Sequence, residues 1–577
     1  MRVNSPGIGS APAAGALCFS GRDIPITESD TVASALIAAG ELGNRRDQNG
    51  GMRGIWCGMG VCHECAVSID ADNGSLACIT PAKAGQIVQP QPVYQLTPSD
   101  ATARGETELT PDVLVIGAGP AGLSATRNLA TAGLDVLLLD DRAQLGGQFY
   151  KQPSPGLPLE VAKLDRQYLH GRDLIAATRA TGARILLSTA VWAAFGSDHL
   201  LARSSDERWR IRPKRVVIAT GACERGVPLP GWTLPGVMTT GAGQTLLRSY
   251  QVAPGARVLV AGTGPLNVQL AAELAQVGVT VVALVETARM LAPTRIGWGM
   301  RMGLNAPHLT LSGVRYLTTL AGKRVPLLTG SVVDLLEGDE DRGVRRATVT
   351  RINSTGRVTG SRRTFEVDAV CLGYGFVPRT ELARALGCQH EYDPARGSLV
   401  TVTDETGRTS LPTVWSIGDS AGVRGAKFAQ LQGALAAAVI TAELTGHPLM
   451  PSARYTRAAR RNLAFQQAVN ALFAAPILTD QLATPDTIVC RCESVLYAEI
   501  VDAMRGLTSA PGSVKRITRA GMGACQGRYC GPVLTEMHSR VTGIPIGERS
   551  GFAPQAPVRP VPLSDVAAPC TDERPIC

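Results

Sequence analysis

Eight of the fourteen cysteines lie in two tight groups near the two ends of the 577-residue chain, and these groups constrain the fold more than any other feature. The sequence starts without the charged residues and long apolar centre of a signal peptide, so we expect a cytoplasmic chain with reduced thiols. Groups of reduced cysteines indicate metal or cluster binding rather than disulfides. The front group consists of Cys57, Cys62, Cys65 and Cys78, and the end group of Cys490, Cys492, Cys525 and Cys530.

The front group has the spacing C-x4-C-x2-C-x12-C, and plant-type [2Fe–2S] sites share the C-x4-C-x2-C start. Gly58 and Gly60 let the loop wrap an inorganic cluster and aim backbone amides at its sulfurs. Zinc is the alternative, but zinc sites more often use two C-x2-C knuckles, so the spacing favours a cluster. His63 lies between two of the cysteines, and we expect a loop residue there, because a Rieske-type site would replace two cysteines with histidines.

The end group has the spacing C-x-C-x32-C-x4-C. Thiolates one residue apart can reach one iron from a single turn, and the C-x4-C pair can close the other side. The pattern resembles the bacterioferritin-associated-ferredoxin type of [2Fe–2S] domain, including Gly523 and Gly527 around Cys525. Zinc or a disulfide pair is the alternative here, and a cluster in either group could also serve only to fold its module.

A dinucleotide-binding motif lies between the two groups, where Gly117-Ala-Gly119-Pro-Ala-Gly122 follows the apolar segment DVLVI. The first glycine permits the tight turn, the second lets a pyrophosphate approach, and the third lets the helix pack on the strand. The amides at the helix N-terminus then face the phosphate. Asp140 ends the next strand, 18 residues after Gly122, where a carboxylate can accept hydrogen bonds from ribose hydroxyls. Together these features predict dinucleotide binding.

A second unit of the same shape departs from the motif, since it reads Gly262-Thr-Gly264-Pro-Leu-Asn267. A side chain in place of the third glycine forces helix and strand apart or must find its own partner. Glu286 could still bond a ribose, and it would repel the extra phosphate of NADP. The residues leave two interpretations open, a working NAD site or a retained fold with an empty pocket.

Several motifs resemble the two-dinucleotide-domain flavoprotein reductases, in which a GGQ stretch lies near the flavin and a Gly-Asp pair holds its ribityl and phosphate portion. The resemblance implies FAD in the first unit. Disulfide reductases of this architecture carry a redox pair of cysteines close to the flavin, but no cysteine lies between Cys78 and Cys223 or between Cys223 and Cys371, which argues against disulfide exchange. We assign no catalytic residue. The residues expected to bind FAD are Gly117, Gly119, Pro120, Ala121, Gly122, Asp140, Asp141, Gly147, Gln148, Gly418 and Asp419.

These patterns predict an α/β chain with the two-dinucleotide-domain flavoprotein reductase fold, an N-terminal β-grasp [2Fe–2S] module and a small C-terminal [2Fe–2S] domain. The length is about four times the usual domain size, which agrees with several domains. Because the flavoprotein block separates the two cysteine groups, we expect each group to bind its own cluster independently. The expected division is a ferredoxin-like module at 1–91, a linker at 92–110, a flavoprotein domain at 111–450 with a second nucleotide subdomain inserted at about 240–370, a helical connector at 451–485, a bacterioferritin-associated-ferredoxin-like domain at 486–550 and a Pro-rich, extended tail at 551–577.

Composition excludes several other classes of protein. Apolar residues make up 45% and charged residues 18%, which rules out a disordered chain. The net charge of +9 is small for this length and the arginines are scattered, so nucleic-acid binding is not expected. No apolar run reaches the ~20 residues that a transmembrane helix needs.

The order of parts resembles the α-type subunits of flavin–iron–sulfur amine dehydrogenases, a group with hydrogen cyanide synthase, opine oxidases, D-hydroxyproline and dye-linked proline dehydrogenases and heterotetrameric sarcosine oxidase. Apart from the cysteines, LPGWTLPGVMTTGAGQTLL is the most family-like run. In that family the front module is often a separate small subunit, and here it is fused. The resemblance implies FAD, two [2Fe–2S] clusters, an FMN at a subunit boundary, and a partner β subunit resembling D-amino-acid dehydrogenases that carries the substrate-oxidising flavin.

The expected function is therefore that of an electron-transfer subunit, cytoplasmic or peripheral at the membrane. Its complex would oxidise the C–N bond of an amino acid, imino acid or opine and pass electrons to a quinone or other carrier. One alternative is an NAD(P)H-dependent reductase that feeds a carrier, favoured by the second nucleotide unit and opposed by Asn267. Another is a non-catalytic scaffold with structural clusters.

Overall fold

The front module is a small mixed sheet with one helix packed on it. The computed structural model describes residues 1–91, 105–339, 341–447, 453–505 and 511–566. Five strands lie in the order β2-β1-β7-β5-β6, and the apolar face of the helix packs on them. Its elements are β1 (Ala13–Phe19), β2 (Arg22–Thr27), α1 (Val32–Ala38), β3 (Gly43–Arg46), β4 (Met52–Gly54), β5 (Ala66–Ile69), β6 (Asp72–Leu76) and β7 (Ile87–Pro90).

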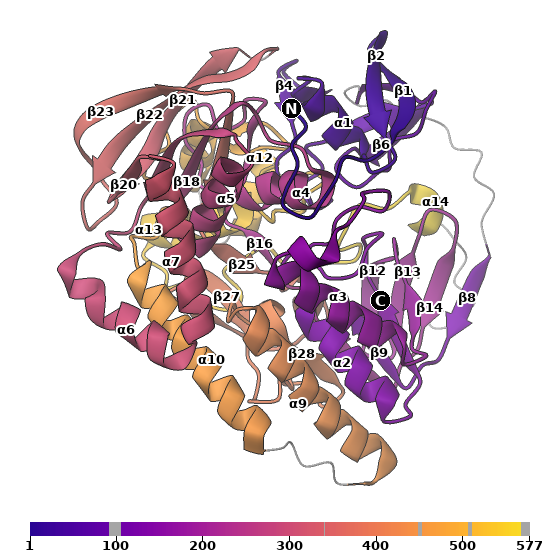
Figure 1. Cartoon of the computed structure of the whole chain (residues 1–577). Helices are drawn as coiled ribbons and strands as arrows, with labels where there is room; N and C mark the ends of the chain where they lie inside the picture. Colours follow the sequence, from indigo (N-terminus) through magenta and orange to yellow (C-terminus); the bar gives the residue numbers. More distant parts are fainter. Residues whose placement is uncertain (92–104, 340, 448–452, 506–510, 567–577) are drawn as a thin grey trace.

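The first nucleotide unit is built on a parallel sheet in the order β11-β10-β9-β15-β28. Its central strands read VLVI and VLLL and are buried along their whole length, as expected for a parallel sheet covered on both faces. Helix α2 packs against both α3 and α9 beside it (Figure 1). The elements are β9 (Val113–Ile116), α2 (Pro120–Thr131), β10 (Val136–Leu139), α3 (Arg166–Arg179), β11 (Arg184–Leu186), β15 (Arg215–Ile218), β28 (Val414–Ser416) and α9 (Ala426–Thr445).

A four-stranded sheet in the order β12-β13-β14-β8 lies beside the first unit. Its edge strand β8 falls inside the segment expected to be a linker, so the linker prediction is wrong for these residues; residues 92–104 of that segment lie outside the described chain. The backbone of β8 pairs with β14, and that long-range pairing leaves no periodic signal in the local sequence. The strands are β8 (Glu106–Leu109), β12 (Ala190–Gly196), β13 (His199–Arg203) and β14 (Arg208–Ile211).

The second nucleotide unit contains a parallel sheet in the order β17-β24-β18-β19-β20, followed by the antiparallel sheet β21-β22-β23. Its helices α6 and α7 project from the body of the molecule (Figure 1). The elements are β17 (Val237–Thr239), α4 (Thr240–Tyr250), β18 (Arg257–Gly262), α5 (Pro265–Gln276), β19 (Thr280–Glu286), α6 (Ile296–Asn305), α7 (Pro307–Gly322), β20 (Leu327–Thr329), β21 (Ser331–Asp339), β22 (Gly343–Ile352), β23 (Val358–Glu366) and β24 (Ala369–Gly373).

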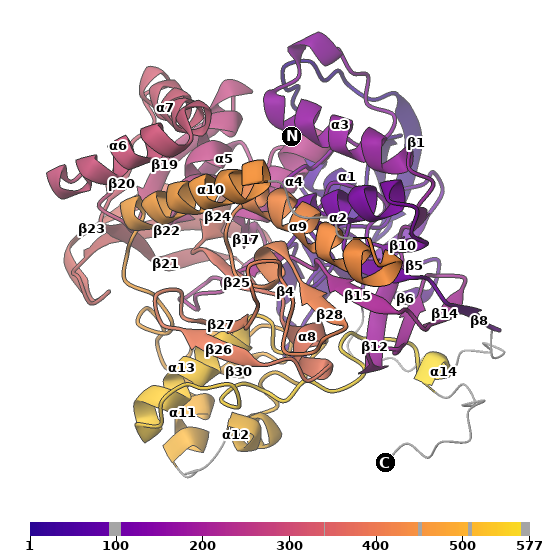
Figure 2. The ribbon, with the colours of Figure 1, turned by 90° about the horizontal axis from the view of Figure 1, so that it is seen from below.

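The connecting elements lead from the nucleotide units to the end module. Figure 2 shows α9 and α10 crossing the middle of the molecule, with the end module on one side. These elements are η1 (Val161–Lys163), β16 (Ala222–Glu224), η2 (Pro293–Arg295), β25 (Phe376–Pro378), α8 (Glu381–Ala385), β26 (His390–Asp393), β27 (Ser398–Thr401), η3 (Gly418–Ser420), α10 (Ala453–Leu472), β29 (Ile488–Cys490), β30 (Val495–Leu496), α11 (Tyr497–Arg505), α12 (Pro511–Thr518), α13 (Cys530–Thr542) and α14 (Leu563–Val566).

The described part of the tail, residues 551–566, is mostly extended and ends in the short helix α14. It returns to the four-stranded sheet beside the first nucleotide unit, where the backbone N–H of Val558 donates to the carbonyl of Trp192 at 2.8 Å. Asp565 forms ion pairs with Arg203 and Arg208 at 2.7 and 3.0 Å. The tail is thus an arm that fastens the end module to the flavoprotein block.

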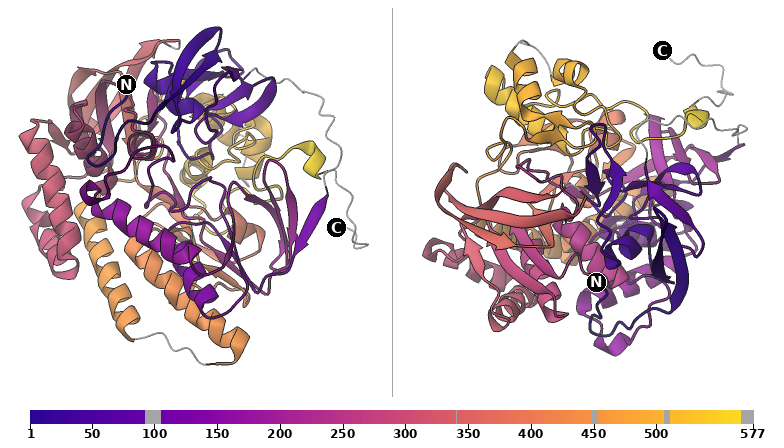
Figure 3. Two further views of the ribbon diagram at one scale, coloured as in Figure 1. Left: turned by 45° about the vertical axis from the view of Figure 1, so that its right-hand side comes forward. Right: turned by 90° about the horizontal axis from the view of Figure 1, so that it is seen from above.

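The front and end modules also contact each other, although the flavoprotein block separates them in the sequence (Figure 3). The hydroxyl of Ser494 donates to the carboxylate of Asp47 at 2.9 Å, and the side chain of Gln48 donates to the backbone carbonyl of Glu493. The two modules are therefore neighbours in the folded chain, and independent binding of their clusters stays a prediction.

Candidate functional site

A large cavity of about 1550 Å³ lies between the two nucleotide units. It exceeds the roughly 300–1,000 Å³ of ordinary ligand pockets, so it has room for a whole dinucleotide. Gly122 and Gly418 do not line it but lie behind its wall, in close contact with Gly117 and Ala121. The other nine residues expected to bind FAD all line it, namely Gly117, Gly119, Pro120, Ala121, Asp140, Asp141, Gly147, Gln148 and Asp419.

The three glycines of the first motif differ in what surrounds them. A Cβ atom on Gly117 would lie 2.4 Å from the carbonyl oxygen of Ala219, and one on Gly122 would lie 1.8 Å from the carbonyl oxygen of Gly117. Gly119 lines the cavity at the N-terminus of α2, and a Cβ atom there would meet no described protein atom within 4 Å. The first and third glycines thus serve the fold, while the second leaves a space that suits a pyrophosphate.

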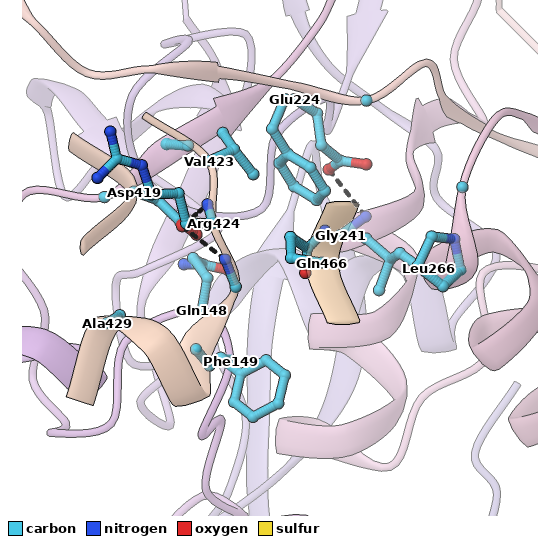
Figure 4. A pocket seen from close by; sticks show the side chains of 18 of the residues that line it. Gln148, Phe149, Glu224, Gly241, Leu266, Asp419, Val423, Arg424, Ala429 and Gln466 are labelled. Carbon is cyan, nitrogen blue, oxygen red and sulfur yellow. Dashed lines mark hydrogen bonds between the residues drawn. The ribbon is translucent and has the colours of Figure 1, made fainter. Parts of the chain in front are cut away.

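Two of the predicted acids are held in place by backbone amides. The carboxylate of Asp140 accepts hydrogen bonds from the N–H groups of Ala118 and Arg142 at 2.6 and 2.9 Å. Burial, reinforced by the charge of Asp141, raises the pKa of Asp140 to about 6. The carboxylate of Asp419 accepts from the N–H groups of Arg424 and Gly425 at 3.0 and 3.2 Å (Figure 4). Both side chains are therefore fixed at the cavity wall.

Asp141 has a different environment from the one expected. Its carboxylate forms an ion pair with Arg559 of the C-terminal arm at 2.7 Å, and both residues line the cavity. A ligand at this point would meet the pair rather than a free carboxylate. No local pattern predicts the pair, since its partners lie 418 residues apart.

Three polar residues in the cavity were not expected from the sequence, namely Lys151, Glu224 and Gln244. The ammonium of Lys151 donates to Gln244 Oε1 at 3.0 Å, and Glu224 Oε2 accepts from the N–H of Gly241 at 2.8 Å (Figure 4). Burial lowers the pKa of Lys151 to about 7 and raises that of Glu224 to about 7. Gln244 Nε2 is buried without a hydrogen-bond partner in the described chain, which fits a cavity that takes a polar ligand.

In the second nucleotide unit, the side chains of Asn267 and Glu286 form hydrogen bonds with other residues of the same unit. The side chain of Asn267 is buried; it accepts from the hydroxyl of Thr240 at 2.7 Å and donates to the carbonyl of Gly373 at 2.9 Å. Glu286 accepts from the N–H groups of Gly264 and Ala288 at 3.1 and 2.8 Å, and burial raises its pKa to about 7. The side chain that replaces the third glycine has thus found its own partners.

The segment after α10 also covers the glycine loop of the second unit. The hydroxyl of Thr263 donates to the carbonyl of Phe473 at 3.2 Å, and Arg295 donates to the carbonyls of Ala471 and Ala474. A backbone carbonyl at this loop would repel a phosphate. The expectation of a helical connector at 451–485 did not include this role, because the local sequence does not show which part of the fold the segment after the helix contacts.

The front cysteines meet in one buried site. The thiol of Cys57 contacts those of Cys62 and Cys78, and backbone N–H groups point at the sulfurs of Cys57 and Cys62, from Met59 at 3.5 Å and from Glu64 at 3.4 Å. Burial acts to raise the pKa of Cys57, but these sulfur and amide hydrogen bonds outweigh it and hold that pKa well below its usual value. Cys57 is therefore held as a thiolate, the form that binds a cluster. Burial raises the pKa of Cys62 well above its usual value, and the contacts with Cys57 and Cys65 do the same for Cys78.

The front loop is also fitted closely to α4. A Cβ atom on Gly58 would lie 2.9 Å from Cα of Ala242, and the N–H of Thr239 donates to the carbonyl of Trp56 at 2.9 Å. Glycine is therefore needed at position 58 for two reasons. A side chain would prevent the front loop from packing on α4, and the residue has a left-handed φ of 62°.

The end cysteines form a second site. The sulfur of Cys492 lies 3.9 Å from that of Cys490 and 3.6 Å from that of Cys525, and the N–H of Gly521 points at Cys490 at 3.5 Å. Cys530 begins α13 beside them. Within the described ranges, no group of three or more His, Cys, Asp or Glu side chains has the arrangement of a site for a metal ion. The assignment of clusters therefore rests on the convergence of the thiols and on family resemblance.

The front cysteine site contacts both the cavity and the end cysteine site. Cys57 and Met59 of the front loop line the cavity. Cys62 and Glu64 of the same loop line a small space that they share with the four end cysteines. The front site therefore contacts both the cavity and the end site, and the end loop also reaches the cavity through Arg528.

Three family models match the chain. Residues 111–438 match the pyridine nucleotide-disulphide oxidoreductase family, a flavoprotein family whose domain implies FAD. Residues 16–92 match a 2Fe-2S iron-sulfur cluster binding domain, and residues 488–537 match a BFD-like [2Fe-2S] binding domain. The expected fold class, with a cluster-binding module on each side of a flavoprotein block, is confirmed.

Among curated proteins, an opine oxidase subunit of Rhizobium meliloti (strain 1021) is 35% identical, over 79% of this chain and 98% of that protein. Hydrogen cyanide synthase subunit HcnB of Pseudomonas aeruginosa is 30% identical, over 78% of this chain and 97% of that protein. The crystal structure of L-proline dehydrogenase from P. horikoshii has a TM-score of 0.70 at 21% identity, covering 97% of this chain and 98% of that one, so the two share a fold. Within the described residues, no helix is both long enough and apolar enough to span a membrane.

Proposed function

Since the chain belongs to the pyridine nucleotide-disulphide oxidoreductase family, and is similar to subunits of opine oxidase and hydrogen cyanide synthase, we propose that it is the flavin- and [2Fe–2S]-carrying electron-transfer subunit of an enzyme that oxidises a C–N bond. The substrate class is an amino acid, an imino acid or an opine. A flavin supplies two-electron chemistry and a [2Fe–2S] cluster one-electron transfer. The supporting observation is the position of the front cysteine site, which touches the cavity through Cys57 and the end site through Cys62.

We further propose which residues hold each cofactor. The eight grouped cysteines hold the two clusters, within modules that follow the division given above. Gly119 and the N-terminus of α2 receive the pyrophosphate of FAD, while Asp140 and Asp419 face its hydroxyl and phosphate portions. Lys151 and Gln244 then bind the polar edge of the ligand deeper in the cavity.

Other subunits are implied because relatives of this chain are themselves subunits. We propose a β subunit that resembles D-amino-acid dehydrogenases and carries the substrate-oxidising flavin, with an FMN at the boundary and a quinone or other carrier as acceptor. The test is to purify the native complex and add a panel of amino acids, imino acids and opines under anaerobic conditions. One substrate class should bleach the flavin of the complex and leave the isolated chain unreduced. Bleaching of the isolated chain by a substrate would contradict the division of labour.

A second candidate function is an NAD(P)H-dependent reductase, favoured because Thr263, Gly264 and Leu266 of the second unit line the same cavity. The hydrogen bonds of Asn267 and Glu286 and the carbonyl of Phe473 at the glycine loop oppose it.

We expect the isolated chain to be a poor NADH oxidase in steady-state assays, with dithionite bleaching of the same flavin as the control. Turnover with NADH of roughly 10 per second or more, within the range of ordinary enzymes, would favour the reductase instead.

A further inference from the structure

A buried salt bridge joins the two cysteine sites directly. Glu64 lies between Cys62 and Cys65 in the front loop, and Arg491 lies between Cys490 and Cys492 in the end loop. Arg491 Nη2 lies 3.2 Å from Glu64 Oε2, with the side chains 4% and 1% exposed. Each member of the pair is flanked by proposed cluster ligands of its own module and contacts the other module.

The guanidinium of Arg491 is held on several sides. It lies over the rings of Trp56 and Trp232, with centroid distances of 4.3 and 4.8 Å. Its Nη1 donates to the carbonyl of Trp232 at 2.5 Å, and Nε1 of the same tryptophan donates to the carbonyl of Ile488 at 2.6 Å. Arginine suits this site because its planar cation can stack and bond at the same time, which a lysine ammonium cannot do.

Glu64 also pairs with an arginine of its own front module, because Arg45 Nη2 lies 2.8 Å from Glu64 Oε1. The interface also contains a buried pair between Arg53 and Asp47. It therefore places three arginines against two carboxylates in a largely buried interface. Charges in such a place act over several ångströms with little screening, so each one acts on both neighbouring sites.

We propose that Glu64 and Arg491 are positioning residues shared by both cysteine sites, so that each of them sets the reduction equilibrium of the cluster in the other module as well as in its own. This rests on the proposed function, in that both sites carry [2Fe–2S] clusters. Sequence position alone assigns Arg491 to the end cluster and Glu64 to the front cluster. The salt bridge places both charges between the two sites.

The test is a redox titration of the full-length protein with dithionite, followed by electron paramagnetic resonance so that the two clusters are resolved. In R491Q, loss of the cation should make reduction of both clusters harder, by about tenfold in the equilibrium constant, the scale expected for one nearby charge in a protein site. In E64Q, loss of the anion should make reduction of both clusters easier. R505Q is the matched control: it removes an arginine of the end module that pairs with Asp502, both side chains are more than 70% exposed, and it should leave both equilibria unchanged.

The outcomes separate the inference from the proposed function. A shift confined to the cluster beside the changed residue, or equal shifts in R505Q, would overturn the shared role and leave the function intact. Wild-type protein without two [2Fe–2S] signals would overturn the function itself. If R491Q loses iron, the E64Q variant provides the test, because its substitution lies in the front module. A shift in the reduction equilibrium of the front cluster alone in E64Q would refute the shared role.

Discussion

Gly119→Leu is expected to abolish FAD binding while the chain stays folded. A Cβ atom at position 119 meets no described protein atom within 4 Å, so a leucine there projects into the cavity without disturbing the packing. It would fill the space at the N-terminus of α2 that a pyrophosphate needs. We expect the affinity for FAD to fall by about a hundredfold or more, which corresponds to roughly 3 kcal/mol. The measurement is the ratio of bound flavin to protein after gel filtration, with thermal unfolding as the check on folding.

Gly322→Leu is a suitable control for that substitution. Gly322 is the last residue of α7, and it too has no neighbour within 4 Å of an added Cβ atom, but it does not line the cavity. This variant should keep the flavin content of the wild type. A Gly119→Leu protein that folds and keeps its full complement of FAD would show that the assignment of the first nucleotide unit is wrong.

Cys62→Ser and Cys525→Ser are each expected to remove about half of the iron, because each [2Fe–2S] cluster uses four ligands and the two cysteine groups are separate sets. In the first variant the front signal should disappear from the spectrum of the reduced protein, and in the second the end signal. FAD should stay bound in both, since neither residue lines the cavity. Iron analysis and electron paramagnetic resonance measure the two losses separately.

Cys388→Ser serves as a control for the cysteine variants. Cys388 is a buried thiol in the core of the first nucleotide unit, so its replacement should leave the iron content unchanged. Zinc in place of iron in the wild-type protein would refute both cluster assignments. Loss of all iron from one serine substitution would show that the two sites assemble only together. Unchanged transfer to the acceptor in both cysteine variants would favour structural clusters and a scaffold function.

Sequence patterns predicted those parts of this protein that depend on neighbours along the chain. The spacing of Cys57, Cys62 and Cys65 indicates a cluster loop because a loop must wrap its ligand locally. The glycines at 117, 119 and 122 indicate a dinucleotide turn for the same reason. The matching family models confirm a cluster-binding domain on each side and a flavoprotein block between them.

Contacts between distant segments could not be predicted in this way. Arg491 and Glu64 lie 427 residues apart, and nothing near either residue indicates the other. Lys151 and Gln244 meet only because α4 folds against the loop that follows the GGQ stretch. The departure at Asn267 was visible in the sequence, but its two hydrogen-bond partners come from α4 and β24, so only the fold could show how the side chain is satisfied.

The C-terminal arm affects how this protein would acquire and keep its flavin. Val558 and Arg559 form part of the cavity wall, yet a ribosome makes them after every other described segment that lines it. During synthesis the first nucleotide unit can fold while that side of the cavity is still open, so a dinucleotide can enter before the arm docks. Once Arg559 has paired with Asp141, escape of the ligand past this side requires the arm to detach. Retention of the flavin then depends on the rate of a local unfolding event as well as on its affinity.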